Sequence, residues 1–313
     1  MKLRLRSLIA LALVVAGCSG ASDEPIHLYT SVTEATVSAV VDAFEAESGR
    51  SVEVFRAPTG ELAARIAAEK RSGGIQADVL WLSDPLSMQQ YASDGLLRVW
   101  QPEGAEAVAA EYKTETFWGT RILSMVIVHN SGVVPLRSWS DLTLPEYAGK
   151  VAAPDPAFAG SALAVLAYFG SDEKFGLDYY RALADNGLVV VKAPGEVVSG
   201  VAEGRFDAGI TLDFSARAAL EKGSPIAIVW PTSGAVAIYS PIGVVDASER
   251  PAEELVEFVL SRDAQQLIAD TGWQPIREDV SWNAGGEQVS VDWGALLEGR
   301  EKLLAEYQSI LDG

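Results

Sequence analysis

The stretch IHLYTSVTEATVSAVVDAFEAESGRSVEVFRA, residues 26–57, decides the fold class. It opens with a short apolar segment at residues 26–30 and continues with apolar residues at helical spacing from Thr33 to a glycine at position 49. It then closes with the alternating pattern SVEVFRA. The change of hydrophobic period from strand to helix and back predicts a strand, a helix ended by glycine, and a second strand.

The same alternation continues along the chain. Helices are predicted at residues 58–74 and 84–97, and buried strands at residues 77–84 and 122–130. Further strands and helices alternate from residue 150 to residue 247, and one helical pattern covers residues 251–272. This order predicts an α/β fold with a largely parallel sheet covered by helices.

The N-terminal segment has the pattern of a secretory signal. Three basic residues precede the apolar run at residues 8–16, which is too short for a membrane span of roughly 20 residues. Small residues and Cys18, the only cysteine of the chain, come next. This arrangement resembles the lipobox of bacterial lipoproteins, which implies a signal peptide at 1–17, a lipidated Cys18 and a tether at 18–25. The alternative is an ordinary cleaved signal that happens to contain a cysteine.

Composition excludes several classes of function. The formal net charge is −19, and no basic cluster offsets it, so nucleic acid is not an expected partner. Cys18 is the only thiol, which excludes disulfides within the chain, zinc–thiolate sites and a cysteine nucleophile in the folded body. The two histidines, His27 and His129, form no short metal-binding motif. Because no nucleophile elbow is present either, we expect no enzyme and no cofactor.

Five segments in register resemble the extracellular solute-binding proteins of ABC importers. They lie at residues 29–54, 57–84, 138–156, 201–210 and 240–279. The branch that they resemble comprises the ferric-iron, phosphonate and sugar-phosphate binders of the type II periplasmic-binding fold. The resemblance implies a monomer at the periplasmic or extracellular face that passes its ligand to an ABC permease, anchored through lipid at Cys18.

The resemblance also implies two α/β lobes, a hinge and an interlobe cleft. Lobe 1 would comprise residues 26–122 and 239–313, and lobe 2 would comprise residues 123–238. The lobe to which the C-terminal tail belongs stays open. The chain would cross between the lobes near Arg121 to Met125 and again near Ala237 to Ser240.

Small hydroxyl or glycine residues stand at several strand-to-helix junctions, where α/β proteins bind ligands against free helix N–H groups. Asp213 and Tyr239 add a carboxylate after a strand and an aromatic ring near the second crossing. The expected ligand is a small polar anion, such as a phosphonate or a phosphorylated metabolite. The alternative for each junction residue is an N-cap without ligand, for Asp213 an N-cap or an i,i+4 partner of Arg217, and for Tyr239 hinge packing. The predicted ligand-binding residues are Thr30, Ser31, Thr59, Gly60, Ser83, Gly160, Ser161, Asp213 and Tyr239.

Two other functions stay open from the sequence. Ferric iron is an alternative ligand, although the tyrosine pair of iron-binding relatives falls here at Asp213 and Phe214. The adjacent Tyr179 and Tyr180 lie in a predicted amphipathic helix, so no metal ligand is assigned to them. A surface adhesion or scaffold lipoprotein is the alternative from another class, and it would need no cleft.

Overall fold

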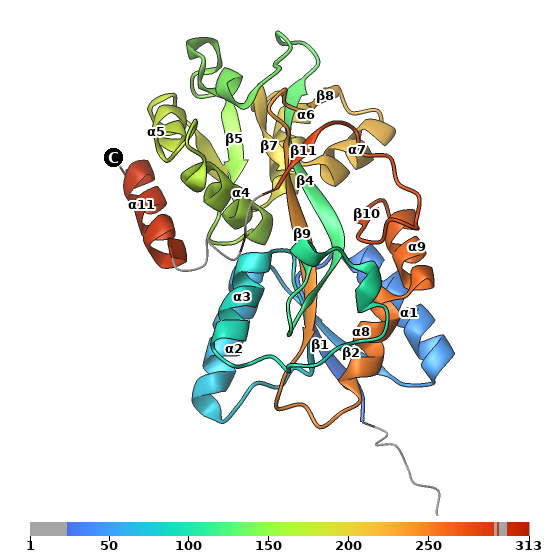
Figure 1. Cartoon of the computed structure of the whole chain (residues 1–313). Helices are drawn as coiled ribbons and strands as arrows, with labels where there is room; N and C mark the ends of the chain where they lie inside the picture. The colour runs from blue at the N-terminus through green and yellow to red at the C-terminus, as the bar shows by residue number, and fades with distance from the viewer. Residues whose placement is uncertain (1–23, 291–292, 294–298, 313) are drawn as a thin grey trace, which may run out of the picture.

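The computed structural model describes residues 24–290, 293 and 299–312. The predicted signal peptide, Cys18 and most of the predicted tether lie outside the described residues. The molecule has two α/β lobes, stacked one above the other (Figure 1). The first lobe contains β1 (Ile26–Thr30), α1 (Glu34–Ser48), β2 (Val52–Arg56), α2 (Thr59–Ser72), β3 (Val79–Trp81), α3 (Pro85–Ser93), α8 (Ala252–Leu260) and α9 (Arg262–Asp270). The second lobe contains β5 (Val151–Pro154), α4 (Gly160–Ser171), α5 (Asp178–Asp185), β6 (Val189–Val191), α6 (Pro194–Ala202), β7 (Ala208–Leu212), α7 (Asp213–Glu221) and β8 (Ile226–Val229).

Two long strands connect the lobes. β4 (Trp118–Asn130) and β9 (Ala235–Val244) pair antiparallel in the middle of the sheet order β2-β1-β3-β9-β4-β7-β5-β6. The outer neighbours pair in parallel: β1 with β2 and β3, and β5 with β6 and β7. The strands next to the central pair run antiparallel to it: β3 to β9, and β7 and β8 to β4. The expectation of a largely parallel sheet therefore holds inside each lobe. It is wrong at the centre, because a chain that crosses to the second lobe and returns must run there in both directions.

The central strands are buried along nearly their whole length. Every residue of β9 and every residue of β4 except Asn130 is buried, which accounts for the mainly apolar composition of both segments. The helical pattern at 251–272 forms two helices instead of one. Ser261 has extended backbone angles and caps α9 by accepting the backbone N–H of Ala264, so the chain turns between α8 and α9.

The C-terminal segment returns to the second lobe. β11 (Gln288–Val289) pairs with the start of β9, and α11 (Arg300–Asp312) packs against α4 and α5, as Figure 1 shows at its left edge. The ring of Tyr307 on α11 meets the ring of Tyr180 on α5 edge to face, with centroids 5.2 Å apart. A short β10 (Gln274–Pro275) pairs with β4 near the crossing, and four 3-10 turns (Ala105–Ala107, Ala110–Tyr112, Trp139–Thr143 and Pro145–Tyr147) complete the described elements.

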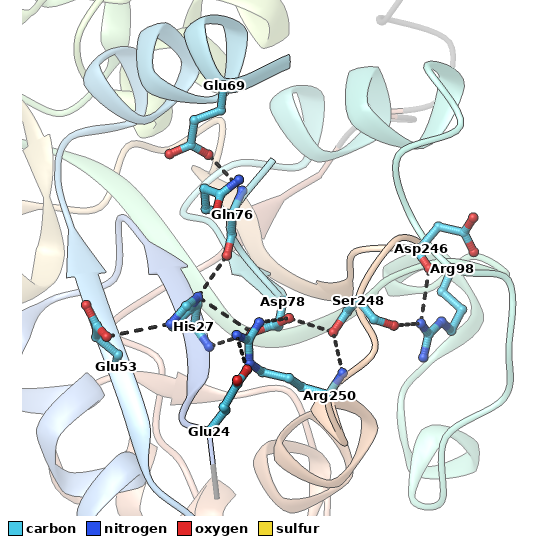
Figure 2. A network of polar contacts seen from close by, with 10 residues as sticks. All are labelled: Glu24, His27, Glu53, Glu69, Gln76, Asp78, Arg98, Asp246, Ser248 and Arg250. Atoms are coloured by element: carbon cyan, nitrogen blue, oxygen red, sulfur yellow. Dashed lines mark hydrogen bonds and ion pairs between the residues drawn. The ribbon is translucent and has the colours of Figure 1, made fainter. Parts of the chain in front are cut away.

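A buried carboxylate fastens the base of the first lobe (Figure 2). Asp78, which is 2% exposed, accepts the backbone N–H of His27 at 2.7 Å and the hydroxyl of Ser248 at 2.6 Å. Arg250 lies 3.3 Å from Asp78 and also pairs with Glu24 at 2.8 Å. These contacts join the start of β1 to the loop after β9, and they satisfy the buried charge at the end of the lobe remote from the lobe contact.

Among the described residues, none of the helices has both the length and the apolar character that crossing a membrane requires.

Candidate functional site

A cavity of about 370 Å³ lies between the two lobes. The first lobe contributes residues that follow its strands, including Ser31, Thr33, Thr59 and Ser83. The second lobe contributes the start of α4 and of α6, and the central strand β4 contributes Arg121 and Leu123. The volume falls in the range of small-molecule sites, and the position beyond the strand ends is where open α/β sheets bind ligands.

Arg121 is the only buried charged residue among those that line this cavity. Its side chain comes from the first third of β4, and the residue is 1% exposed. The guanidinium nitrogens Nε and Nη1 are buried without a hydrogen-bond partner among the described residues. Burial lowers the pKa of Arg121 to about 9, because no neighbouring carboxylate offsets the lost hydration of the cation.

An aromatic stack holds the Arg121 side chain in place. The guanidinium carbon lies 4.2 Å from the ring centroid of Trp273, whose other neighbour is the ring of Phe214 at 4.2 Å and 14°. The indole N–H of Trp273 donates to the hydroxyl of Thr33 at 3.2 Å. The cation is therefore positioned by stacking while its hydrogen-bond donors stay available.

Helix N-termini surround the cavity without side-chain caps. The N-cap residues of five helices line it, and none of them makes a capping side-chain bond: Thr33 for α1, Pro58 for α2, Ala159 for α4, Ala193 for α6 and Leu212 for α7. Away from the cavity, α3 and α9 are capped by the side chains of Asp84 and Ser261, whereas α5 and α8 also lack a side-chain cap. The five helices at the cavity leave free backbone N–H groups and the positive ends of their dipoles toward it.

A cluster of hydroxyls lies on the first-lobe wall. The Oγ atoms of Ser31 and Ser83 are 3.0 Å apart, and the backbone N–H of Ser83 donates to Ser31 Oγ at 2.9 Å. Thr59 Oγ1 is 3.4 Å from Ser83 Oγ. Buried Ser161 adds a hydroxyl from the second lobe.

The rim of the cavity carries both signs of charge. Arg56 and Lys192 are exposed there, and so are Glu61 and Glu196. Two cations and two carboxylates in water roughly balance each other. The charge preference of the interior is therefore set by Arg121 and the helix N-termini.

The structure brings five of the nine predicted binding residues into the cavity lining: Ser31, Thr59, Ser83, Gly160 and Ser161. It places the other four elsewhere. Thr30 is buried, and its hydroxyl donates to the carbonyl of Trp81 at 2.7 Å. Tyr239 is buried, and its ring packs on that of Tyr112 with centroids 5.6 Å apart.

The remaining two, Gly60 and Asp213, have other contacts. A Cβ atom added to Gly60 would lie 2.4 Å from the carbonyl oxygen of Ala157 in the opposite lobe, so this glycine permits close lobe contact. The carboxylate of Asp213 pairs with Arg217 at 3.0 Å, the i,i+4 alternative that the sequence offered. Burial is the main cause that raises the pKa of Asp213.

Sequence reasoning missed Arg121 as a residue of the cavity. The available signal was the segment WGTRILSMVIVHN, residues 118–130, in which one arginine interrupts an otherwise apolar central strand. A charged residue predicted at a buried strand position requires a partner, and none is apparent from the local sequence.

Tyr179 and Tyr180 lie on α5, away from the cavity lining. Both are buried, and the ring of Tyr179 packs on Phe169 with centroids 4.6 Å apart. The Tyr179 hydroxyl donates to the carbonyl of Trp139 at 2.9 Å. Within the part of the chain that the structure describes, no three histidine, cysteine, aspartate or glutamate side chains gather as a metal site would need.

Comparison with known proteins gives one consistent picture. The family model described as bacterial extracellular solute-binding protein matches residues 26–274. The sulfate-binding protein of Synechocystis sp. is 24% identical over 313 residues, with 92% of this chain and 85% of that protein covered. The structure of the periplasmic binding protein AfuA from Actinobacillus pleuropneumoniae, with fructose-6-phosphate bound, has a TM-score of 0.83 at 20% identity and covers 92% of this chain and 98% of that chain. Iron-bound HitA from Pseudomonas aeruginosa has a TM-score of 0.79 at 21% identity and covers 91% and 99%.

Proposed function

The chain belongs to the family of bacterial extracellular solute-binding proteins, and from this premise we propose that it captures a small anion between its lobes for an ABC importer. The protein performs no chemistry on this ligand. Closure of the lobes on the ligand presents the loaded form to a membrane permease. A periplasmic location fits this family.

The observation that carries the proposal is the unpaired, buried guanidinium of Arg121. A cation removed from water without a counter-ion destabilises the protein unless something negative shares its environment. An anion in the cavity supplies that charge and accepts hydrogen bonds from Nε and Nη1. The free N–H groups of the uncapped helices and the cluster of Ser31, Thr59 and Ser83 supply further donors.

The size of the cavity supports an organic anion rather than a bare inorganic ion. One water molecule takes a share of about 30 Å³ in the liquid, so about 370 Å³ accommodates a phosphonate or a phosphorylated metabolite. Two similar proteins are associated with oxyanions: one is named for sulfate, and one holds the organic anion fructose-6-phosphate. The negative net charge of the chain does not oppose this, because salt screens it beyond about 8 Å.

The lobe boundaries follow from the same proposal. We place the crossings near Arg121 to Met125 on β4 and near Ala237 to Ser240 on β9, where these strands pair with each other. We further propose that Cys18 carries the lipid anchor. An intact mass that shows acylation in the wild type and not in Cys18→Ser tests this point.

A thermal-shift screen tests the ligand class. The purified protein is heated with sulfate, inorganic phosphate, methylphosphonate, fructose 6-phosphate, putrescine or ferric citrate. A ligand at a hundred times its dissociation constant adds about 2.7 kcal/mol to the free energy of unfolding. We expect stabilisation by at least one phosphorus- or sulfur-containing anion, and loss of that shift in Arg121→Met.

Three outcomes would contradict the proposal. Stabilisation by putrescine alone would assign a cationic ligand, and stabilisation by ferric citrate that survives Arg121→Met would favour the iron alternative. A protein that no compound stabilises, and whose Ser31, Thr59 and Ser83 tolerate alanine without consequence, would fit the scaffold alternative.

A further inference from the structure

A second buried charge lies where the two lobes touch. Asp84 is the N-cap of α3 in the first lobe and is fully buried. Its Oδ1 accepts the backbone N–H of Ser87 at 2.7 Å, whereas its Oδ2 is buried without a partner among the described residues. A carboxylate oxygen in this condition is costly while it is ionised.

The second lobe covers this oxygen. A Cβ atom at Gly160, the first residue of α4, would lie 2.5 Å from Asp84 Oδ2 and 2.7 Å from Thr59 Oγ1. On the same side of the cavity, Gly60 of the first lobe lies against the carbonyl of Ala157. One glycine from each lobe thus permits a close approach, and the structure describes the lobes in contact.

The ionisable groups that face Asp84 come from two other positions. Arg300 on α11 favours the charged carboxylate, as does the N–H of Ser87. Tyr91 on α3 stays neutral, because burial raises its pKa to about 12. Burial is the largest influence on Asp84, and it raises the pKa of this carboxyl despite Arg300.

We propose that Asp84 couples lobe closure to the uptake of one proton. In the open form Gly160 moves away and water hydrates an ionised carboxylate. In the closed form the carboxylate takes a proton from solvent and becomes the neutral acid, which the dry lobe contact accommodates. Closure itself follows from the two-lobed fold, whereas the effect on ligand capture rests on the proposed function.

The sign of the effect follows from proton linkage. The closed form binds one more proton than the open form wherever the pH lies between the ordinary pKa of an aspartate, about 3.9, and its raised value in the closed form. Falling pH in this range therefore favours closure, by up to tenfold per pH unit. Ligand affinity changes in the same direction, because only the closed form grips the ligand from both sides.

Small-angle X-ray scattering of the ligand-free full chain tests the proposal. The radius of gyration is measured at about pH 5 and at about pH 8, both above the ordinary pKa of an aspartate. We expect the wild type to be more compact at the lower pH. Asp84→Asn keeps an oxygen for the N–H of Ser87 but cannot ionise, so it should be compact at both values.

Two further variants make the result decisive. Asp172→Asn removes a carboxylate of a similar kind at the other end of α4, where it accepts the N–H groups of Lys174 and Phe175. It should retain the change in compactness. If Asp84→Asn does not fold, Asp84→Ser replaces it, because serine is also a good N-cap without an ionisable group.

The proposal is overturned if the wild type has the same radius of gyration at both pH values, if an Asp84 variant keeps the change, or if Asp172→Asn loses it. The same samples titrated with inorganic phosphate and fructose 6-phosphate separate the two claims. If compaction depends on Asp84 but the protein binds neither compound, the inference about Asp84 stands. The absence of binding then counts against the anion-binding function.

Discussion

Replacing Arg121 by methionine should stabilise the ligand-free protein and abolish anion binding. Methionine keeps the length of the side chain and its stacking on the ring of Trp273, but it removes the buried charge. A residue whose removal increases stability while it eliminates binding is one that the fold retains for its function.

The magnitude follows from the desolvation of the guanidinium. Every pKa unit corresponds to about 1.4 kcal/mol. Lowering the pKa of Arg121 from 12.5 to about 9 therefore represents a penalty of roughly 5 kcal/mol in the empty site. The cation–π contact with Trp273 returns about 1–2 kcal/mol, so a net gain of about 3–4 kcal/mol is expected for the methionine variant. At about 2 °C per kcal/mol for a chain of this size, the melting temperature should rise by roughly 7 °C.

Thermal and urea unfolding measure both effects. One set of samples is free of ligand, and parallel sets contain inorganic phosphate or fructose 6-phosphate. Arg217→Met is the matched control, because the Arg217 guanidinium is paired with Asp213 at 3.0 Å and with the carbonyl of Gly272 at 2.7 Å. That variant should lose stability. The reasoning is refuted if Arg121→Met destabilises the ligand-free protein as much as Arg217→Met does, or if it still binds the anion that stabilises the wild type.

Three further outcomes are expected. Above about pH 9 the empty site loses the Arg121 proton, whereas the anion-bound site retains it, so that binding takes up a proton. The affinity measured by calorimetry should therefore fall by up to tenfold per pH unit. An affinity that is independent of pH in this range would contradict the unpaired state of this cation. Gly160→Ala should weaken ligand-induced compaction in solution scattering, since the new methyl group would lie 2.5 Å from the Asp84 carboxylate of the opposite lobe. In the control Gly195→Ala the new methyl group has no heavy atom within 4 Å, so the lobes should close normally. Tyr179→Phe should lower the free energy of unfolding by about 1 kcal/mol through loss of the hydrogen bond to Trp139. The visible absorption on addition of ferric citrate should be the same as for the wild type. A tyrosinate band that the wild type shows and this variant lacks would favour the iron alternative.

The positions of the helix starts were predictable because they depend on local signals. Hydrophobic periodicity placed the first strand, the helix from Thr33 and the glycine end at Gly49 correctly, and the same reasoning placed the start of α4 at Gly160. In parallel α/β units these helix starts gather at one edge of the sheet. The sequence therefore indicated the region of the molecule in which the interlobe cavity lies.

Neighbouring residues at one strand end were harder to separate. Thr30 and Ser31 are adjacent and chemically alike, but the Thr30 side chain bonds to the carbonyl of Trp81 in the interior, whereas Ser31 lines the cavity. Successive side chains of a strand point to opposite faces, so the choice depends on which face the rest of the chain covers. Ser261 shows the complementary case, in which a local cap divides a helical pattern that looked continuous.

The sequence by itself determined the α/β fold, the order of its elements and the strand-to-helix junctions, because these follow from periodicity and helix-end chemistry over a few residues. Only the tertiary structure decided which charges are left unsatisfied. Arg121 and Asp84 are buried by segments far away in the sequence, and whether a buried charge has a partner depends on everything packed around it. The electrostatic character of the cavity and of the lobe contact is therefore a property of the assembled fold.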